Sequence, residues 1–203
     1  MRFQASRFCV VVLALICPGI LGGQHRLAAQ EQRPVEYDYL LLATNRTSTM
    51  QEEMQEASDV GYAFVGVMGG ETSFGGSEVV VVMQREPDSE PRFEYRLLAT
   101  SKTSTMQKEM QEAGDAGFEY RGQTVFGTTF GGDEPVVILE RSRDSANGDL
   151  FEYRLLATKQ TSTMQDELRE AGLAGFDFVG VTIASTRFGG DEIVTILKRA
   201  VTE

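Results

Sequence analysis

The sequence predicts an α+β protein made of three tandem β-α-β-β modules, each a three-stranded sheet with one helix on one face. Two observations predict this fold. The same 49-residue pattern recurs at 37–85, 93–141 and 151–199 without a gap. Inside each copy, the spacing of apolar residues changes from a period of two to a helical period and back again.

The three copies are closely similar in sequence. By direct count, the second and third copies share 32 of 49 positions, the first and second share 26, and the first and third share 25. Polar spacers of different sequence lie at 86–92 and 142–150, which is typical of linkers. Residues 30–36 form a linker before the first copy, and 200–203 form a tail. We therefore expect a tandem triplicate of one small unit.

The opening stretch of each copy predicts a strand. In the second copy, Phe93, Tyr95 and Leu97 alternate with Glu94 and Arg96. A period of two with aromatic and branched side chains is typical of a strand that has one buried face.

A helix is expected next in each copy. Apolar residues recur at i, i+4 and i+7, which places them on one helical face. They are Met50, Met54, Ala57, Met106, Met110, Ala113, Met164, Leu168 and Ala171, and we expect the methionines to fill the core. A serine stands three residues before a glutamine at each helix start, as in a capping box. The pairs are Ser48 with Gln51, Ser104 with Gln107, and Ser162 with Gln165.

The helix is expected to end at a glycine, and two further strands follow it. Gly61, Gly117 and Gly175 suit the left-handed residue that closes many helices. The Phe-Gly-Gly string then predicts a hairpin between the second and third strands. The third strand is apolar on both faces, which suits a central strand, although the right-handed crossover rule leaves the strand order open.

A module of this size is expected to be marginal alone, because a chain of 60 residues buries only about 60% of its unfolded surface. The outward face of the second strand is apolar in copies one and three, but copy two carries Glu119, Arg121 and Gln123 there. We therefore predict that copies one and three bury these sheet faces, on each other, and that copy two keeps this face wetter.

Residues 1–29 are interpreted as a secretory signal peptide. Arg2 and Arg7 precede an apolar run that ends at Ile16 and is too short to span a bilayer. Cleavage after Ala29 would leave 174 residues and remove three arginines but no acid, so the net charge would change from −11 to −14. This predicts a secreted bacterial protein, periplasmic or extracellular, with no membrane attachment after cleavage.

The mature chain would contain no Cys, His or Trp. It would therefore have no thiolate nucleophile, no histidine base and no His/Cys metal or haem site. An acidic surface without clustered Lys and Arg argues against nucleic acid as a partner. We expect no cofactor and no metal, and the sequence leaves open whether the partner is a protein or a small molecule.

The module resembles a small bacterial β-α-β-β family known only as a domain of unknown function. The matching features in the second copy are the aromatic-x-Tyr strand at 93–95, the Gly-x-x-Gly-aromatic-x-aromatic segment at 114–120 and the closing Arg141. The first copy has Ser58 in place of the first glycine, and this chain has Tyr or Phe where the family often has Trp. The resemblance implies the fold and no established activity, so it assigns no functional residues.

The Thr-Ser-Thr-Met-Gln string at each helix start is identical in all three copies. Hydroxyls and free N–H groups at a helix N-terminus can hold a phosphate or carboxylate. The candidate anion or ligand contacts are Ser48, Thr49, Ser104, Thr105, Ser162 and Thr163. No Gly-rich loop or constant basic residue accompanies the string, so helix capping is the simpler interpretation.

Recurring acids are the other candidates for chemistry. The Ser/Asp-Glu pair after each Phe-Gly-Gly cannot form a calcium cage, because adjacent strand residues point to opposite faces. Glu53, Glu109 and Glu167 recur on the helices, where the polar face of an amphipathic helix accounts for them. Glycosidase chemistry needs two carboxyls about 5–10 Å apart, and nothing in the sequence places such a pair. We therefore predict no catalytic residues.

Caps, turns and core positions are what the copies share, and this favours a structural role for them. The leading hypothesis is a non-enzymatic binding or scaffold protein that acts through surfaces between or outside its modules. The alternative is a small-ligand carrier or sensor with an aromatic-lined pocket between modules. A more remote alternative is a carboxylate-based hydrolase.

Overall fold

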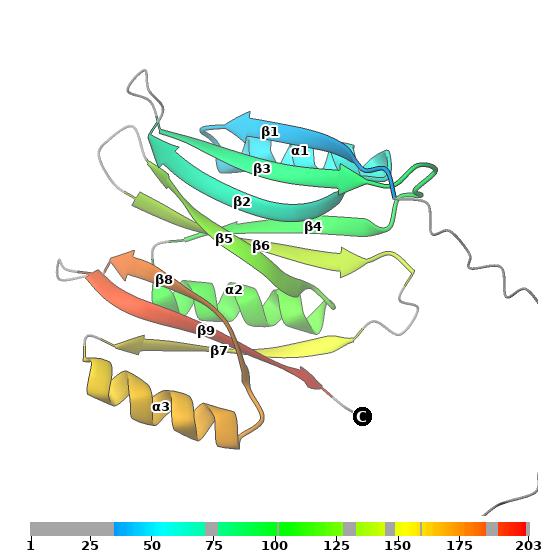
Figure 1. The fold of residues 1–203 in the computed structure, drawn as a ribbon. Coiled ribbons are helices and arrows are strands. Elements are labelled where there is room, and N and C mark those ends of the chain that lie inside the picture. The colour runs from blue at the N-terminus through cyan, green and yellow to red at the C-terminus, as the bar shows by residue number, and fades with distance from the viewer. Residues whose placement is uncertain are drawn as a thin grey trace, which may run out of the picture. The chain divides into compact units, whose positions relative to one another are not determined.

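Each copy folds into strand, helix, strand and strand, as the sequence predicts (Figure 1). The structure is a computed structural model that describes residues 35–71, 77–100, 102–127, 133–144, 149–158, 160–185 and 191–201. In chain order the elements are β1 (Asp38–Thr44), α1 (Thr47–Asp59), β2 (Ala63–Glu71), β3 (Ser77–Arg85), β4 (Phe93–Ala99), α2 (Thr103–Asp115), β5 (Glu119–Gly127), β6 (Asp133–Ser142), β7 (Leu150–Thr158), α3 (Thr161–Leu173), β8 (Asp177–Ser185) and β9 (Asp191–Val201). The proposed signal peptide and the Phe-Gly-Gly residues lie outside the described residues.

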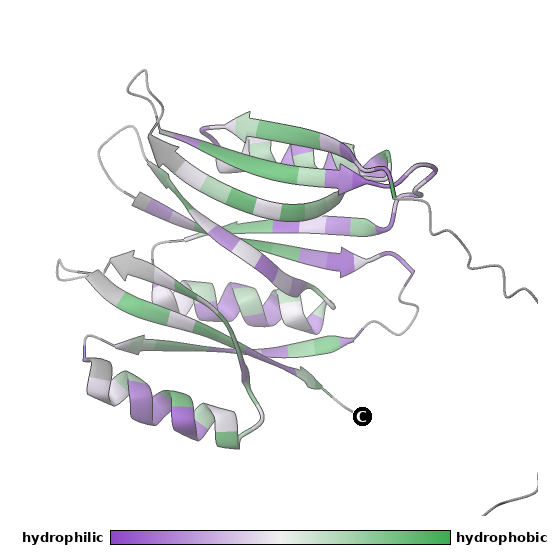
Figure 2. Ribbon diagram, viewed as in Figure 1, coloured by the Kyte–Doolittle hydropathy of each residue, from purple (hydrophilic) through white to green (hydrophobic). Residues whose placement is uncertain are grey.

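Every module, numbered 1 to 3 along the chain, has its own antiparallel sheet with the third strand in the centre. Sheet A has the order β1-β3-β2, sheet B has β4-β6-β5 and sheet C has β7-β9-β8. The central position follows from the apolar residues on both faces of the third strand, which are green in Figure 2 along β3 and β9. The first and second strands of each module are parallel to each other on either side of it, since both pair antiparallel with it.

The three helices end in the same way, and the predicted glycines are responsible. Gly61, Gly117 and Gly175 have φ values of 91°, 81° and 81°, in the left-handed region. In module 1, Gly61 N–H donates to the Ser58 carbonyl and Tyr62 N–H donates to the Ala57 carbonyl, which is a Schellman motif. In the part of the chain that the structure describes, no helix is both long and apolar enough to cross a membrane.

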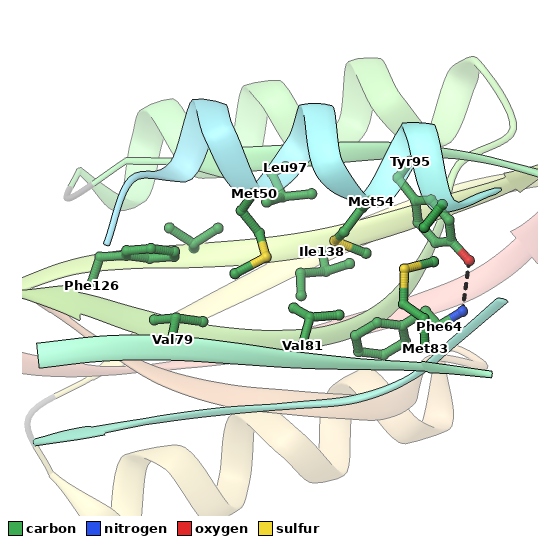
Figure 3. Close-up of a cluster of buried hydrophobic side chains, with 12 residues drawn as sticks. Met50, Met54, Phe64, Val79, Val81, Met83, Tyr95, Leu97, Phe126 and Ile138 are labelled. Atoms are coloured by element: carbon green, nitrogen blue, oxygen red, sulfur yellow. Dashed lines mark hydrogen bonds between the residues drawn. The ribbon is translucent and has the colours of Figure 1, made fainter. Parts of the chain in front are cut away.

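Layers of sheet and helix alternate in the order sheet A, α1, sheet B, α2, sheet C, α3 (Figure 1). Met50 and Met54 of α1 lie in one apolar cluster with Val81 of sheet A and Ile138 of sheet B (Figure 3). An equivalent cluster joins Met106 and Met110 of α2 to sheets B and C, so the predicted role of these methionines as core residues is confirmed. Each of the first two helices therefore packs against its own sheet and also the next one.

The prediction that modules 1 and 3 cover each other's sheets is wrong, because module 2 lies between them. Its sheet is buried on both faces, and every residue of β6 from Pro135 to Glu140 is buried. The polar residues of β5 that suggested a wet face instead have partners. Lys198 of module 3 forms an ion pair with Glu119, Arg121 pairs with Glu140, and Gln123 donates to a carbonyl of module 3.

The arginine that closes each third strand caps the end of the neighbouring helix. Arg141 donates to the Ala116 carbonyl at 3.0 Å, forms an ion pair with Glu94 and lies over the Phe118 ring. Arg85 and Arg199 make the equivalent contacts in modules 1 and 3. These arginines therefore tie strand, helix end and aromatic residue together within each module.

Candidate functional site

The predicted ligand contacts at the helix N-termini lie at three separate places. Ser48 and Thr49 belong to α1, Ser104 and Thr105 to α2, and Ser162 and Thr163 to α3, each in a different layer (Figure 1). The serines are exposed, and the structure does not bring the three pairs together. Each pair remains a candidate contact by itself.

The capping-box interpretation of these serines is wrong. The helices start two residues earlier than expected, so the N-cap residues are Arg46, Lys102 and Gln160, and none of them caps through its side chain. The threonine before the serine recurs in all three copies, and at the first helix it contacts the next module. Thr47 Oγ1 donates to Glu134 of sheet B at 3.2 Å, which joins modules 1 and 2.

The contact between two successive modules is called a junction here, and junction 1–2 joins modules 1 and 2. The glutamine that recurs at the start of every helix lies in these junctions. Gln51 Oε1 accepts from Leu97 N–H at 2.8 Å, across the contact between α1 and β4. Gln107 Oε1 accepts from Leu155 N–H at 2.7 Å in the next junction, and its Nε2 donates to the Tyr153 carbonyl. The strands β4 and β7 are sheet edges with unpaired backbone groups, so these glutamines protect edges that would otherwise remain open.

One tyrosine per junction connects the sheet of a module to the strand of the module before it. The Tyr95 hydroxyl accepts from Phe64 N–H at 2.8 Å, as the dashed line in Figure 3 shows. The Tyr153 hydroxyl accepts from Tyr120 N–H at 2.6 Å in the equivalent place. Both N–H groups lie where the strand pairing shifts register, so the phenol satisfies a donor beside a bulge.

A ring over a glycine completes each junction. A Cβ atom on Gly122 would lie 3.3 Å from the Phe64 ring, and a Cβ on Gly180 would lie 2.4 Å from the Tyr120 hydroxyl. Glycine at these positions therefore lets the preceding module approach closely. Gly66 of β2 occupies the equivalent position, beside the bulge in its strand.

Glu140 is a buried acid at junction 1–2. Its Oε2 accepts from the Tyr95 hydroxyl at 2.8 Å, and Oε1 lies 3.4 Å from Arg121 Nε. Burial raises the pKa of Glu140, while the charge of Arg121 and the bond from Tyr95 oppose this rise. Glu119 is the cross-strand neighbour of Glu140, and its charge also favours the protonated form. Glu119 and Glu140 are thus two carboxylates on adjacent strands of sheet B.

The space beside that pair is small. A cavity of about 100 Å³ is lined by Glu119, Glu140 and Asp149 with two phenylalanines. Ligand pockets usually measure a few hundred Å³. Larger hollows of about 530 and 490 Å³ lie beside β1 and at junction 1–2, and charged side chains such as Asp38, Arg85, Asp59 and Arg143 line them. The hollow at junction 1–2 is lined by two aromatic side chains, Tyr95 and Phe118, among five charged ones.

The helical glutamates do not form a cluster. Glu53, Glu109 and Glu167 lie on three helices in three different layers. Within the described ranges, no group of three or more acidic, histidine or cysteine side chains is placed to hold a metal ion.

The two ends of the stack carry the halves of a junction without a partner. On sheet A, Tyr39, Leu41 and Met68 are exposed, whereas Tyr95 and Leu97 at the equivalent positions of sheet B are buried. At the other end, Leu173 and Phe178 are exposed on module 3. The exposed faces at the two ends are therefore the candidate functional surfaces of the described chain.

These end surfaces were not predicted from the sequence, although the repeats carry a signal for them. The tyrosine, glutamine and glycine of the junctions are identical in all three copies, but the tyrosine was predicted as a strand residue and the glutamine as a cap, and the glycine had no predicted role. No protein-family model, curated protein or solved structure matches this chain.

Proposed function

We propose that this is a secreted, non-enzymatic binding or scaffold protein that holds its partner on the exposed face of sheet A. The observation that carries the proposal is the apolar character of this face, which includes Tyr39, Leu41 and Met68. The same face is covered in the other two modules. Contiguous exposed apolar surface on a folded protein commonly marks a site of protein interaction.

The free edge of β1 also supports the proposal. In sheets B and C the corresponding edge receives glutamine side chains from the preceding helix, at Leu97 and Leu155. No module precedes β1 in the part of the chain that the structure describes. An open edge beside an apolar face suits a protein partner, because backbone groups and side chains can both take part in binding.

The alternatives have less support. A small-ligand carrier would use one of the hollows beside β1 or at junction 1–2, but charged residues line both. A hydrolase would use Glu119 and Glu140, where Lys198 and Arg121 already balance the two charges and the cavity is small. Both alternatives give different outcomes in the experiment below.

Native mass spectrometry of the protein recovered from its own compartment tests the proposal. We compare the natural chain with Leu41→Arg on the exposed face and with Glu52→Arg, a control at an exposed position on α1. A macromolecular partner retained by the control and lost from Leu41→Arg is the expected result. A retained small molecule that neither variant displaces would support the carrier. A bound partner that Leu41→Arg leaves in place would contradict the proposal.

Export and family membership belong to the same proposal. The charged start, the short apolar run and the small residues at 27–29 support cleavage of a signal peptide. The intact mass of the exported chain is expected to correspond to a start at Gln30, and a chain that keeps Met1 would contradict export by this route.

We also propose that the modules belong to the β-α-β-β family they resemble, on the strength of the aromatic strand, the helix end and the closing arginine.

A further inference from the structure

Both junctions inside the chain are built from the same two halves. The helix half is a helix with the bulged strand that follows it, for example α1 and β2. The sheet half is the edge and outer face of the next sheet, for example β4 and β5. Junction 1–2 and junction 2–3 repeat the same glutamine, tyrosine and glycine contacts. The interface is therefore built in the same way at both junctions of the described chain.

Module 1 presents a complete sheet half that nothing in the described chain occupies. Tyr39 and Leu41 stand where Tyr95 and Leu97 receive α1. Gly66 is the equivalent of Gly122, but a Cβ atom on Gly66 would meet nothing within 4 Å. A glycine inside a strand costs stability, and here no neighbour within the described chain requires it. A glycine at position 66 leaves room for an aromatic ring from another module, as Gly122 does for Phe64.

Module 3 presents the matching helix half. Phe178 is the equivalent of Phe64, whose ring covers Gly122, yet Phe178 is 59% exposed. Gln165 is the equivalent of Gln51 and Gln107, and it is exposed at the start of α3. The ring that would cover a glycine is thus at one end of the chain, and the uncovered Gly66 is at the other.

A helical glycine gives independent support. A Cβ atom on Gly114 of α2 would lie 2.2 Å from the Phe151 carbonyl oxygen, so the strand of module 3 lies directly against this glycine. At junction 1–2 the equivalent residue is Ser58, whose hydroxyl donates to the Phe93 carbonyl at 2.7 Å. Gly172 occupies the same position in α3, and a Cβ atom on it would meet nothing within 4 Å. Glycine within a helix is unfavourable, so its presence at an open position is explained if a strand lies against α3.

Side chains that differ between junctions also match at the two ends. Asp59 of α1 forms an ion pair with Arg143 at junction 1–2. The equivalent of Asp59 in α3 is Leu173, which is 87% exposed, and the equivalent of Arg143 before module 2 is Pro87. An ionic pair inside the chain thus corresponds to two apolar residues at the ends, which suits contact between them. Arg169 departs from the pattern, because it replaces a glutamine that accepts a hydrogen bond at both internal junctions.

We propose that the partner of the sheet A face is a second copy of this chain, whose α3 and β8 dock there as α1 and β2 dock on sheet B. This inference rests on the proposed function, because it names the partner of the same face. The two surfaces are different, so the contact is heterologous. Each copy keeps one free surface of each kind, and the association therefore continues into filaments unless its rotation closes a ring.

Two blocking variants test this arrangement. Leu41→Arg places a charge on the sheet half, and Gly172→Arg places one on the helix half, both at exposed positions where folding does not require the natural residue. Glu52→Arg adds the same side chain to α1 and serves as the matched control. Masses are measured by sedimentation velocity on the processed protein over a range of concentrations, and circular dichroism checks that each variant is folded.

The natural chain and the control are expected to grow in mass with concentration. Each blocking variant is expected to weaken this association by at least about tenfold. An equimolar mixture of the two variants is expected to form a dimer and nothing larger, because one intact helix half meets one intact sheet half.

Three results would overturn the inference. One is a natural chain that stays monomeric up to a concentration on the order of 100 μM. Another is a Gly172→Arg variant that still dimerises alone, which would indicate contact between two identical faces. The last is a mixture that stays monomeric. If the natural chain is monomeric but a different partner is still lost from Leu41→Arg, the inference fails and the proposed function stands.

Discussion

Sheets A and B carry the same residues in different surroundings. Tyr39 of sheet A is 59% exposed and Leu41 is 64% exposed, whereas Tyr95 and Leu97 of sheet B are 5% and 9% exposed. The two strands differ little in sequence, and both pair with a central strand in the same register. What differs is the preceding helix, which sheet B has and sheet A lacks. In a stack of repeats, burial of a residue depends on its neighbours along the stack as well as on its own module.

The helices show the same contrast at the other end. Met110 of α2 is fully buried between two sheets, while its equivalent Leu168 in α3 is only half-buried. The cluster of buried residues around α3 is the smallest of the three. Terminal layers of a repeat protein usually carry a polar outer face that closes the stack. Here two apolar side chains, Leu173 and Phe178, are exposed at that end beside polar residues of α3.

Truncating the same helix position in both layers should give the largest difference. We expect Met110→Ala to lower the free energy of unfolding by about 2–5 kcal/mol, because it leaves a cavity between two sheets. Leu168→Ala should cost only about 1 kcal/mol, since solvent already reaches this side chain. Urea denaturation of both variants measures the difference. Equal losses would show that α3 is covered as fully as α2.

Removing one hydroxyl from each sheet should have a smaller effect. Tyr95→Phe leaves the buried Phe64 N–H without an acceptor and removes the hydroxyl that donates to Glu140 Oε2, so we expect a loss of about 1–3 kcal/mol. Tyr39→Phe should change stability by less than about 0.5 kcal/mol, because that residue is exposed. Thermal unfolding provides the comparison, and hydrogen exchange at Phe64 should accelerate only in Tyr95→Phe. Unchanged exchange there would mean that the phenol does not reach this N–H group.

Replacing one buried hydroxyl of module 3 should stabilise the protein. Thr195 Oγ1 is buried and has no hydrogen-bond partner among the described residues, and modules 1 and 2 carry Val81 and Val137 at this position. We expect Thr195→Val to stabilise the protein by about 1 kcal/mol, because an unsatisfied polar group no longer has to be buried. Thr158→Val is the control, since its hydroxyl accepts from Gln160 N–H and its loss should be destabilising. Denaturant midpoints distinguish the two, and destabilisation by Thr195→Val would contradict the assignment.

The smallest expected effect is a dependence on pH at junction 1–2. Burial raises the pKa of Glu140, so the folded protein binds this proton more tightly than the unfolded chain does. The contribution of Glu140 to stability is therefore greatest below the unfolded pKa and is lost as pH rises through the folded pKa. Glu140→Gln, which introduces the residue that module 1 has at position 84, removes this dependence.

Stability curves of the two proteins from about pH 4 to about pH 8 test the sign of this effect. As the pH falls, the free energy of unfolding of the natural chain should rise relative to that of Glu140→Gln by up to about 1 kcal/mol. Glu52→Gln is the matched control, because it makes the same substitution at an exposed position of α1. A gain in the opposite direction would mean that the partners of Glu140 outweigh its burial.

The local structure of a module was predictable because short-range physics fixes it. The period-two strand, the methionine face of the helix and the glycine at the helix end need only neighbours a few residues away. The predicted helix start was two residues too late, because the serines and glutamines fit two roles. Local spacing indicated a capping box, whereas Gln51 and Gln107 pair with the next module.

The sequence by itself determined that the chain has three copies of one module, which elements each copy forms and which side chains fill its core. Only the tertiary structure decided the strand order, the order of the layers and the roles of Tyr95, Gly122 and Glu119. Periodicity reports which face of an element is buried, but it does not identify what covers that face. From the sequence alone, a polar residue such as Glu119 is expected to face solvent. In the structure it forms an ion pair with Lys198 of another module.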